Sequence, residues 1–384
     1  MVAPAIDAIS IRGRPGEGLT VAVGDGFSLN IRSRVQVRYQ LALSSPSEDG
    51  SRDVNQIVNI GTARLWLSGN VFREELTYMI QLAVAGRDFR DGAVSPIFDA
   101  YVDWRAHRDL NLRLGQFFVP FDRLRTVREW ALQMADRPIP VGELTLDRDV
   151  GLMLYSDRFL ADGSPVAWRV GVFGGGGTNL TTARVPGGLA VARVELRPLG
   201  PIDDDVEGDL ARRTSPALAL GVALAGNVNT NRLRSTTGPK FEGGATSYAH
   251  GALDLVFKWR GFALQAEGLG KLASSSQIVS RASDGSERVE YTRSAVGFVT
   301  QSSYTFDPPF ELVGRLSGLY AIPPTDPTLV DEVRRGAHEV GLGANYYVHH
   351  HRLKLQVDWI ARLPLDVDVS RASHAIHAQL DVTF

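Results

Sequence analysis

The chain has 384 residues, a formal net charge of −2, 39 glycines and no cysteine. The lack of cysteine excludes a disulfide scaffold, a thiolate metal site and a cysteine nucleophile. The near-neutral charge argues against a globally basic nucleic-acid-binding protein, so no nucleic-acid partner is expected. No run approaches 18 consecutive apolar residues, which excludes a transmembrane helix but leaves room for a wall of amphipathic strands.

Taken in chain order, the first clear pattern is an alternation of apolar and polar residues over 28–41. Leu29, Ile31 and the apolar residues up to Leu41 fall on one face, and the polar face includes Asn30 and Arg32. Side chains on a strand point alternately to opposite sides, so this segment predicts a strand with one apolar and one hydrated face. An amphipathic helix would need apolar residues three and four positions apart instead.

The same alternation recurs to the end of the chain. It predicts sixteen strands, over residues 28–41, 57–69, 76–84, 98–105, 110–114, 150–155, 166–172, 190–196, 217–225, 248–259, 262–271, 291–304, 310–320, 338–348, 353–362 and 376–384. We therefore expect an all-β fold, a transmembrane antiparallel barrel of about sixteen strands over residues 28–384. Residues 1–27 are expected to form an N-terminal periplasmic segment, too short for the plug of an active transporter. They carry no secretory leader, so the sequence is expected to be a mature form.

The connections between these strands alternate in length. Residues 44–56, 85–97 and 117–149 are long, whereas 70–75 and 106–109 are short. Barrels of the bacterial outer membrane have short periplasmic turns and longer external loops. One connection, 198–215, should be periplasmic and yet is long, so strand boundaries beside it are the least certain.

The last segment supports a closed sheet. Ala378, Leu380, Val382 and Phe384 share one face, and the chain ends on that aromatic residue. An ordinary edge strand would give the same pattern. In a membrane, however, unpaired backbone groups cost several kcal/mol each, so a final strand that runs to the last residue fits closure better.

Several stretches resemble the phosphate-selective porin family (porin O/P) of Gram-negative outer membranes. The closest is LRLGQFFVPF at 112–121, followed by DRDVG at 147–151; weaker ones are ARLWLSG at 63–69, DAYV at 99–102 and GVFGGG at 171–176. The resemblance covers mainly residues 28–200. It implies a sixteen-stranded barrel, usually a trimer, whose third long loop folds inward as a constriction, here residues 117–149. That loop is charge-balanced, and Lys is restricted to four positions in the chain. This departs from the lysine clusters of phosphate-preferring members.

The inward positions of the predicted strands favour anions. The basic set is Arg32, Arg34, Arg38, Arg64, Arg105, Arg113, Arg169, Arg193, Arg197, Arg293, Arg315, Arg362, Lys258, Lys271 and Lys354. The acidic set is Asp99, Asp103, Glu195, Asp254, Glu267, Glu311, Glu339, Asp358 and Asp381. The candidate pore-lining and anion-binding residues are Arg32, Arg34, Arg38, Arg64, Arg113, Arg123, Arg125, Arg128 and Arg169. Alternatively, these arginines pair with the acids and stiffen the wall, which is least expected for Arg32, Arg34 and Arg38 because like charges on one strand face repel.

These patterns predict an outer-membrane porin for passive diffusion of small hydrophilic solutes, with a preference for anions such as phosphate. The alternatives are a non-selective or cation-tolerant porin and a structural barrel with a blocked lumen. A barrel enzyme such as a lipase would need a nucleophile and base near the lipid boundary, and no such constellation is visible. No cofactor or metal is expected, and His349, His350 and His351 are more typical of a solvated turn than of a metal site. Expected partners are outer-membrane lipid, lipopolysaccharide, small anions in transit and two further copies of the chain.

Overall fold

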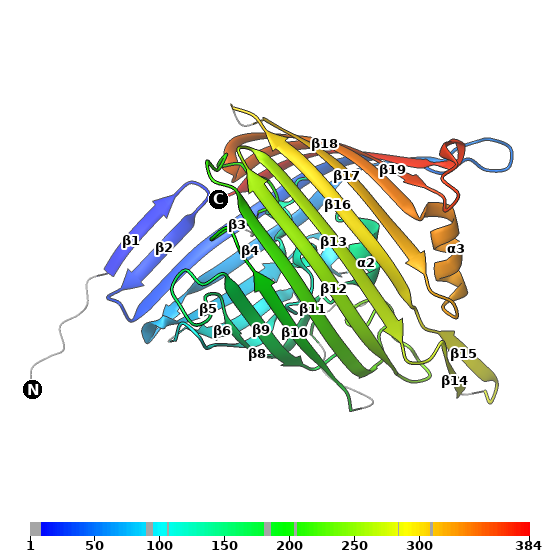
Figure 1. The fold of residues 1–384 in the computed structure, drawn as a ribbon, viewed down its shortest axis with the longest axis horizontal. Helices are drawn as coiled ribbons and strands as arrows, with labels where there is room; N and C mark the ends of the chain where they lie inside the picture. The colour runs from blue at the N-terminus through cyan, green and yellow to red at the C-terminus, as the bar shows by residue number, and fades with distance from the viewer. Residues whose placement is uncertain are drawn as a thin grey trace, which may run out of the picture.

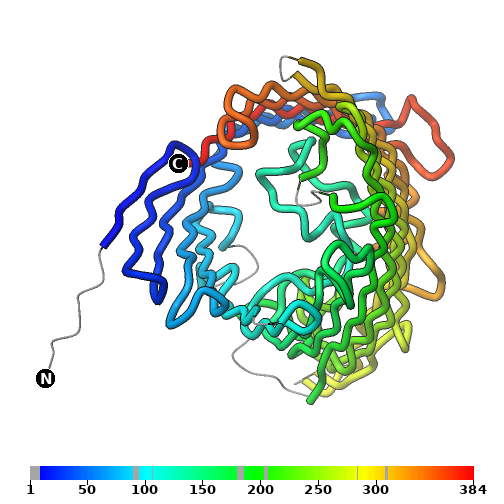
Figure 2. Tube along the Cα trace, turned by 60° about the vertical axis from the view of Figure 1, so that its left-hand side comes forward, coloured from blue at the N-terminus to red at the C-terminus, as the bar shows by residue number. Residues whose placement is uncertain are grey.

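The computed structural model describes residues 9–89, 95–105, 107–179, 186–202, 206–282, 284–307 and 310–384. Across these residues, sixteen antiparallel strands pair in sequence into a closed ring (Figures 1 and 2). They are β3 (Phe27–Leu43), β4 (Val54–Val71), β5 (Arg73–Ala83), β6 (Ile97–Trp104), β7 (Asn111–Phe118), β8 (Arg148–Ser156), β9 (Val166–Phe173), β10 (Gly188–Leu196), β11 (Ala217–Thr230), β12 (Thr246–Trp259), β13 (Phe262–Ala273), β16 (Ala295–Thr305), β17 (Phe310–Ala321), β18 (His338–His351), β19 (Leu353–Leu363) and β20 (Ser373–Thr383). The predicted sixteen-stranded barrel is confirmed.

The ring closes between the last strand and the first strand of the predicted series. β20 pairs with β3 from His374 opposite Leu43 to Thr383 opposite Arg34. Phe384 then donates its N–H to the Ser33 carbonyl at 2.9 Å, and its own carbonyl accepts from Ser33 N–H at 2.7 Å. The terminal strand is therefore hydrogen-bonded to its last residue, as closure requires.

The two faces of the wall follow the alternation read from the sequence. On β3, Val37 is 44% exposed, whereas Arg34 and Arg38 are buried. Exposed leucine, valine and aromatic side chains lie on the outside of the strands, and polar or charged side chains lie inside. Because of this two-sided wall, a chain without a long apolar run can form an apolar outer surface.

Two strands lie before the predicted barrel. β1 (Ile9–Arg14) and β2 (Gly18–Val23) form a hairpin, and β2 also pairs with the start of β3, from Leu19 opposite Ile31 to Val23 opposite Phe27. β3 thus borders β2 near its beginning and β20 along the rest of its length. Part of the expected N-terminal segment is therefore a sheet extension, seen to the left of the barrel in Figure 1; residues 1–8 lie outside the described residues.

The connections emerge in two sets, as expected. One end has eight longer loops, and the sixth holds a second hairpin, β14 (Gln277–Arg281) with β15 (Glu287–Tyr291). Tyr291 belongs to this hairpin and not to the barrel strand predicted from 291, because β16 begins at Ala295. The seventh loop holds the helix α3 (Pro327–Gly336). No helix among the described residues is long and apolar enough to cross a membrane.

Candidate functional site

The third long loop has its own local structure over residues 119–147, here called the inner segment. α1 (Arg123–Thr126) begins at Asp122, whose carboxylate accepts a hydrogen bond from Arg125 N–H at 2.6 Å. A short 3₁₀ turn, η2 (Glu129–Ala131), and α2 (Ile139–Leu144) follow. Apolar side chains of the inner segment pack in one cluster with inward residues of the strands; those from the segment are Val119, Phe121, Leu124, Val141, Leu144 and Leu146. The inner segment is therefore an ordered element that packs against the barrel wall.

The inner segment is bound to side chains of the opposite wall. Arg123 Nε lies 2.8 Å from Asp254 of β12, and Lys271 of β13 lies 2.8 Å from Glu143. Ala135 N–H donates to Asp358 of β19 at 2.6 Å. These partners are buried, inward-pointing residues of their strands, and Figure 2 shows the segment within the ring of strands.

A second segment, residues 206–213, meets the inner segment from the end with the short turns. Glu207 accepts hydrogen bonds from Gln133 N–H at 2.7 Å and from Gln301 at 2.9 Å. Lys258 of β12 donates to the Val206 carbonyl at 2.6 Å. This is the unusually long connection between β10 and β11, and its length is explained by its inward course. Together the two segments occupy the side of the lumen next to β12–β19.

Free space remains on the other side, in two cavities joined by a narrow gap. A cavity of about 510 Å³, here called the vestibule, is lined by residues near the short turns, among them Arg32, Arg105 and Arg169. A second cavity of about 360 Å³, the outer cavity, is lined by residues near the long loops, including Asp53 and Arg362.

The gap between them, here called the eyelet, has a free volume of about 10 Å³. Its lining is Arg34, Arg64, Trp66, Gln81, Phe98, Phe118, Arg125, Arg128, Glu129, Trp130, Arg137 and Arg148. Four of these also line the vestibule: Trp66, Phe118, Arg128 and Trp130. Arg137 also lines the outer cavity. The three spaces therefore adjoin one another along the lumen.

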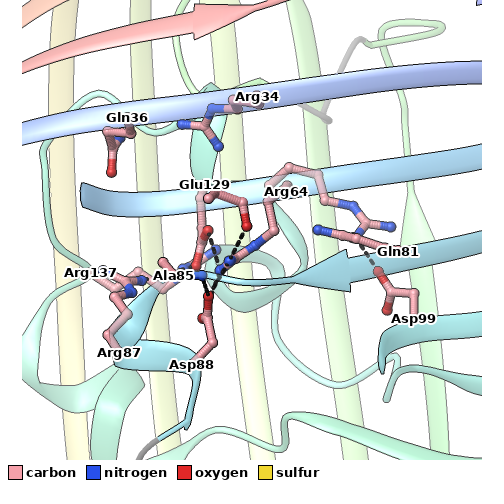
Figure 3. Close-up of polar contacts among 12 residues, drawn as sticks. Arg34, Gln36, Arg64, Gln81, Ala85, Arg87, Asp88, Asp99, Glu129 and Arg137 are labelled. Atoms are coloured by element: carbon pink, nitrogen blue, oxygen red, sulfur yellow. Dashed lines mark hydrogen bonds and ion pairs between the residues drawn. The ribbon is translucent and has the colours of Figure 1, made fainter. Parts of the chain in front are cut away.

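The eyelet is rich in arginine, and most of its charge is compensated. Arg64 contacts Asp88 at 2.5 Å and Glu129 at 3.1 Å, and Figure 3 shows both carboxylates converging on its guanidinium. Arg128 and Arg148 both contact Asp99, at 2.6 and 2.8 Å. Arg125 pairs with Asp147 and Arg34 with Asp381. Six lining arginines against these five carboxylates leave a charge of 6 − 5 = +1.

Arg137 accounts for that excess. Among the described residues its guanidinium has no carboxylate partner, and it donates instead to backbone carbonyls of Leu124 at 3.1 Å and Val127 at 2.5 Å. Burial lowers its pKa to about 10, which leaves it charged at neutral pH. Arg32 in the vestibule is similar: no carboxylate of the described chain pairs with it, and its guanidinium lies 5.0 Å from the centre of the Trp66 ring.

Two inner-segment carboxyl groups have opposite protonation behaviour. Burial alone would raise the pKa of Glu129, but the guanidinium groups of Arg64 and Arg87 outweigh it and hold that pKa well below its ordinary value. Asp122 lines the vestibule, and burial raises its pKa to about 6 despite hydrogen bonds from Thr145 and Arg125. Glu129 is therefore a fixed negative charge, whereas Asp122 loses its charge in mild acid.

The nine predicted arginines are divided by the structure between ion pairs and open positions. Eight have carboxylate partners: Arg34 with Asp381, Arg38 with Asp136, Arg64 with Asp88, Arg113 with Asp103, Arg123 with Asp254, Arg125 with Asp147, Arg128 with Asp99 and Arg169 with Asp157. The expectation of a sparsely paired row at Arg32, Arg34 and Arg38 is thus wrong at two positions. The acids that compensate Arg34 and Arg38 come from β20 and the inner segment, so the pattern within β3 alone could not predict these pairs.

Vestibule and eyelet together contain most of the predicted set. Arg32, Arg113, Arg123, Arg128 and Arg169 line the vestibule. Arg34, Arg64, Arg125 and Arg128 line the eyelet. Arg38 lines neither; it is held by Asp136 at 2.7 Å and by the Ala135 carbonyl at 2.7 Å. Its position indicates that it fastens the inner segment to β3.

The sequence reasoning missed the importance of Arg137, Arg148 and Phe98. Phe98 alternates with the inward Asp99 in the sequence, which predicts an outward side chain, but the pairing of β5 with β6 shifts between Gln81 and Leu82, and Phe98 lines the eyelet. Arg148 lies 3.6 Å from the ring centres of both Phe98 and Phe118. A β-bulge reverses the facing of a residue without changing the composition of the strand, so alternation alone could not reveal it.

The histidine triplet is not wholly a solvated turn. β18 extends to His351, whose ring packs edge-on against Trp130 of the inner segment and against Tyr347, at centroid distances of 5.5 and 5.1 Å. Both His351 ring nitrogens are buried without a hydrogen-bond partner. His351 is therefore part of the packing beneath the inner segment.

Comparison with known proteins identifies the architecture. No protein-family model and no curated protein matches the chain, so the resemblance to phosphate-selective porins stays a prediction. Among solved structures, the outer-membrane channel DcaP of Acinetobacter baumannii has a TM-score of 0.58 at 15% identity, covering 94% of this chain and 98% of that one.

Two other porin structures give similar agreement. An anion-selective porin from Comamonas acidovorans has a TM-score of 0.54 at 14% identity, covering 93% and 100% of the two chains. The trimer form of OmpT, an outer-membrane protein of Vibrio cholerae, has a TM-score of 0.52 at 11% identity, covering 93% and 99%. At these identities the likeness concerns the fold: the chain has the closed sixteen-stranded barrel of outer-membrane porins.

Proposed function

We propose that the chain is an outer-membrane porin that lets small hydrophilic anions diffuse through the path formed by vestibule, eyelet and outer cavity. The observation behind this proposal is the presence of two cations without a carboxylate partner among the described residues, Arg32 in the vestibule and Arg137 where the eyelet meets the outer cavity. A pore selects by its width, its donors and its electrostatic barrier, and all three are defined here by arginine.

The distinction between paired and unpaired arginines decides the selectivity. An arginine beside a carboxylate presents a dipole whose field falls off over a few ångströms, whereas an uncompensated guanidinium presents a full positive charge. Low-dielectric walls focus that charge into the path, and salt screens it over about 8–10 Å. The paired arginines therefore position the inner segment, and Arg32 and Arg137 supply the attraction for anions.

The test is the reversal potential of single channels in a planar bilayer under a salt gradient. The wild type should favour chloride over potassium. Arg32→Gln and Arg137→Gln should each lower the anion-to-cation permeability ratio by about tenfold, because loss of one positive charge costs the anion about 0.7 kcal/mol and relieves the cation by the same amount. Arg12→Gln, on exposed β1, should change nothing and is the matched control. A wild-type channel that prefers cations would refute the proposal.

A structural barrel with a blocked lumen is the second candidate, because the free volume of the eyelet, about 10 Å³, is close to the minimum of roughly 10–15 Å³ needed to hold one water. Conduction then requires movement of eyelet side chains. The two candidates are separated by conductance: a reconstituted barrel that is folded and yet passes no current supports the blocked alternative.

We also propose an outer-membrane location with lipid and lipopolysaccharide around the wall, and a homotrimer as the assembled form. The exposed apolar side chains on the outside of the strands support the first, and the trimer form of the structurally similar OmpT supports the second. Without boiling, the protein should run on an SDS gel as a trimer band that collapses to the monomer on boiling, and chemical cross-linking should make the trimer band survive boiling. A strictly monomeric species would overturn the assembly proposal.

A further inference from the structure

We propose that the vestibule is a binding site for organic carboxylates with a flat apolar body, such as a benzoate-sized anion. The inference rests on the proposed anion channel and narrows its substrate class. It starts from the lining of the vestibule, which places aromatic and thioether side chains beside arginines.

The size of the vestibule suits a single small organic molecule. Its volume is about 510 Å³, within the roughly 300–1,000 Å³ of small-molecule sites. Rings and thioethers from five elements line it: Trp66 of β4, Met79 of β5, Tyr101 of β6, Trp130 of η2 and Met153 of β8.

The charged end of the site is provided by arginines held on aromatic faces. Arg32 lies 5.0 Å from the centre of the Trp66 ring, and Arg113 lies 4.4 Å from that of Tyr101. A ring face attracts a cation without neutralising it, which leaves the guanidinium charge of Arg32 available to a ligand. The planar guanidinium fork matches the two oxygens of a carboxylate.

The lining discriminates between organic and inorganic anions. Phosphate or chloride can use the guanidinium groups but gains nothing from Trp66, Trp130 or the methionines. A flat apolar body attached to a carboxylate buries surface against these groups and stacks against a ring while its charge remains at Arg32. The vestibule should therefore retain benzoate more strongly than phosphate, with cyclohexanecarboxylate, which is apolar but not flat, in between.

The test is direct binding to the detergent-purified, folded barrel, measured by titration calorimetry with benzoate, cyclohexanecarboxylate and inorganic phosphate as separate probes. Trp66→Leu should weaken benzoate binding by about tenfold, the effect of losing one favourable ring contact, and should weaken phosphate binding less, because phosphate uses Trp66 only through Arg32. Trp104→Leu is the matched control, since Trp104 is exposed on the outside of the barrel. A heat-modifiability gel establishes that each variant is folded.

Trp130→Leu is the second variant, should Trp66→Leu fail to fold, and the same loss is expected. Equal affinity for benzoate and phosphate, or benzoate binding unaffected by both substitutions, would overturn the inference. Bilayer recordings separate this failure from failure of the channel proposal. Anion-selective current that benzoate does not reduce rejects the binding site alone, whereas cation-selective current rejects the anion channel itself.

Discussion

Glu129 offers a precise test of the electrostatic reasoning, because it is a carboxylate of the eyelet that can be neutralised without leaving a buried arginine unpaired. It lies 3.1 Å from both Arg64 and Arg87. In Glu129→Gln, Arg64 keeps Asp88 at 2.5 Å, and Arg87, whose side chain is 36% exposed, is hydrated. The free energy of unfolding should therefore change by less than about 1 kcal/mol.

The expected effect on selectivity follows from the charge. Arg64 and Arg87 hold the pKa of Glu129 well below its ordinary value, so the substitution removes a full negative charge at neutral pH. A unit charge about 6 Å from a passing ion contributes about 0.7 kcal/mol at the dielectric constant of water, roughly threefold in a rate. Anions gain this factor and cations lose it, so the anion-to-cation permeability ratio should rise by about tenfold.

Reversal potentials in a tenfold salt gradient measure this ratio. Glu287→Gln, on the exposed hairpin β14–β15, is the control for a change of net charge outside the path. The shift should shrink at high ionic strength, because the Debye length falls to about 3 Å at 1 M salt. An unchanged ratio in Glu129→Gln, or a shift toward cations, would refute the placement of the conduction path at the eyelet.

Three further predictions concern stability, anchoring and pH. Asp381→Ala should lower the free energy of unfolding in urea by about 3–5 kcal/mol, because it leaves the buried Arg34 guanidinium without a partner. The control, Asp366→Ala at an exposed site, should cost less than about 0.5 kcal/mol. Equal effects of the two substitutions would contradict the prediction. Glu207→Ala should remove the acceptor of the hydrogen bonds from Gln133 N–H and Gln301. The inner segment should then move more, and single-channel current noise should increase. Recordings as quiet as those of the wild type would show that Glu207 does not anchor the inner segment. Acidification from pH 7.5 to 5 should raise anion preference as Asp122, with its pKa raised to about 6, takes up a proton and loses its charge. The same raised pKa means that stability should increase as pH falls from about 6 toward the ordinary value of 3.8, and both effects should disappear in Asp122→Asn.

The barrel could be predicted because its rule is local. Alternation with a period of two is imposed residue by residue, so Leu29 and Arg34 reveal their faces without knowledge of any partner strand. The alternating loop lengths and the aromatic C-terminus add two further local signals. These are sufficient for strand number and closure, and for facing except where a bulge intervenes, as at Phe98.

The electrostatics of the path could not be predicted in the same way. Arg34 meets Asp381 across 347 residues of chain, and Arg38 meets Asp136 of the inner segment. Such pairings depend on the shear of the ring and on where the inner segment lies, neither of which is encoded in one strand. The strands alone predicted an excess of inward cations. The structure has a smaller excess, because loops contribute the carboxylates of Asp88, Glu129 and Asp147 to the lumen.

The position of β2 beside β3 has a consequence for how deeply the protein sits in a bilayer. Within the described residues, β1 pairs with β2 alone, so its other side is a free edge with backbone donors and acceptors that need water. In hydrocarbon each such group would cost several kcal/mol. If the protein sits in the outer membrane as proposed, the hydrocarbon layer is expected to end near Ser33 and Phe384, where the ring closes and the hairpin begins.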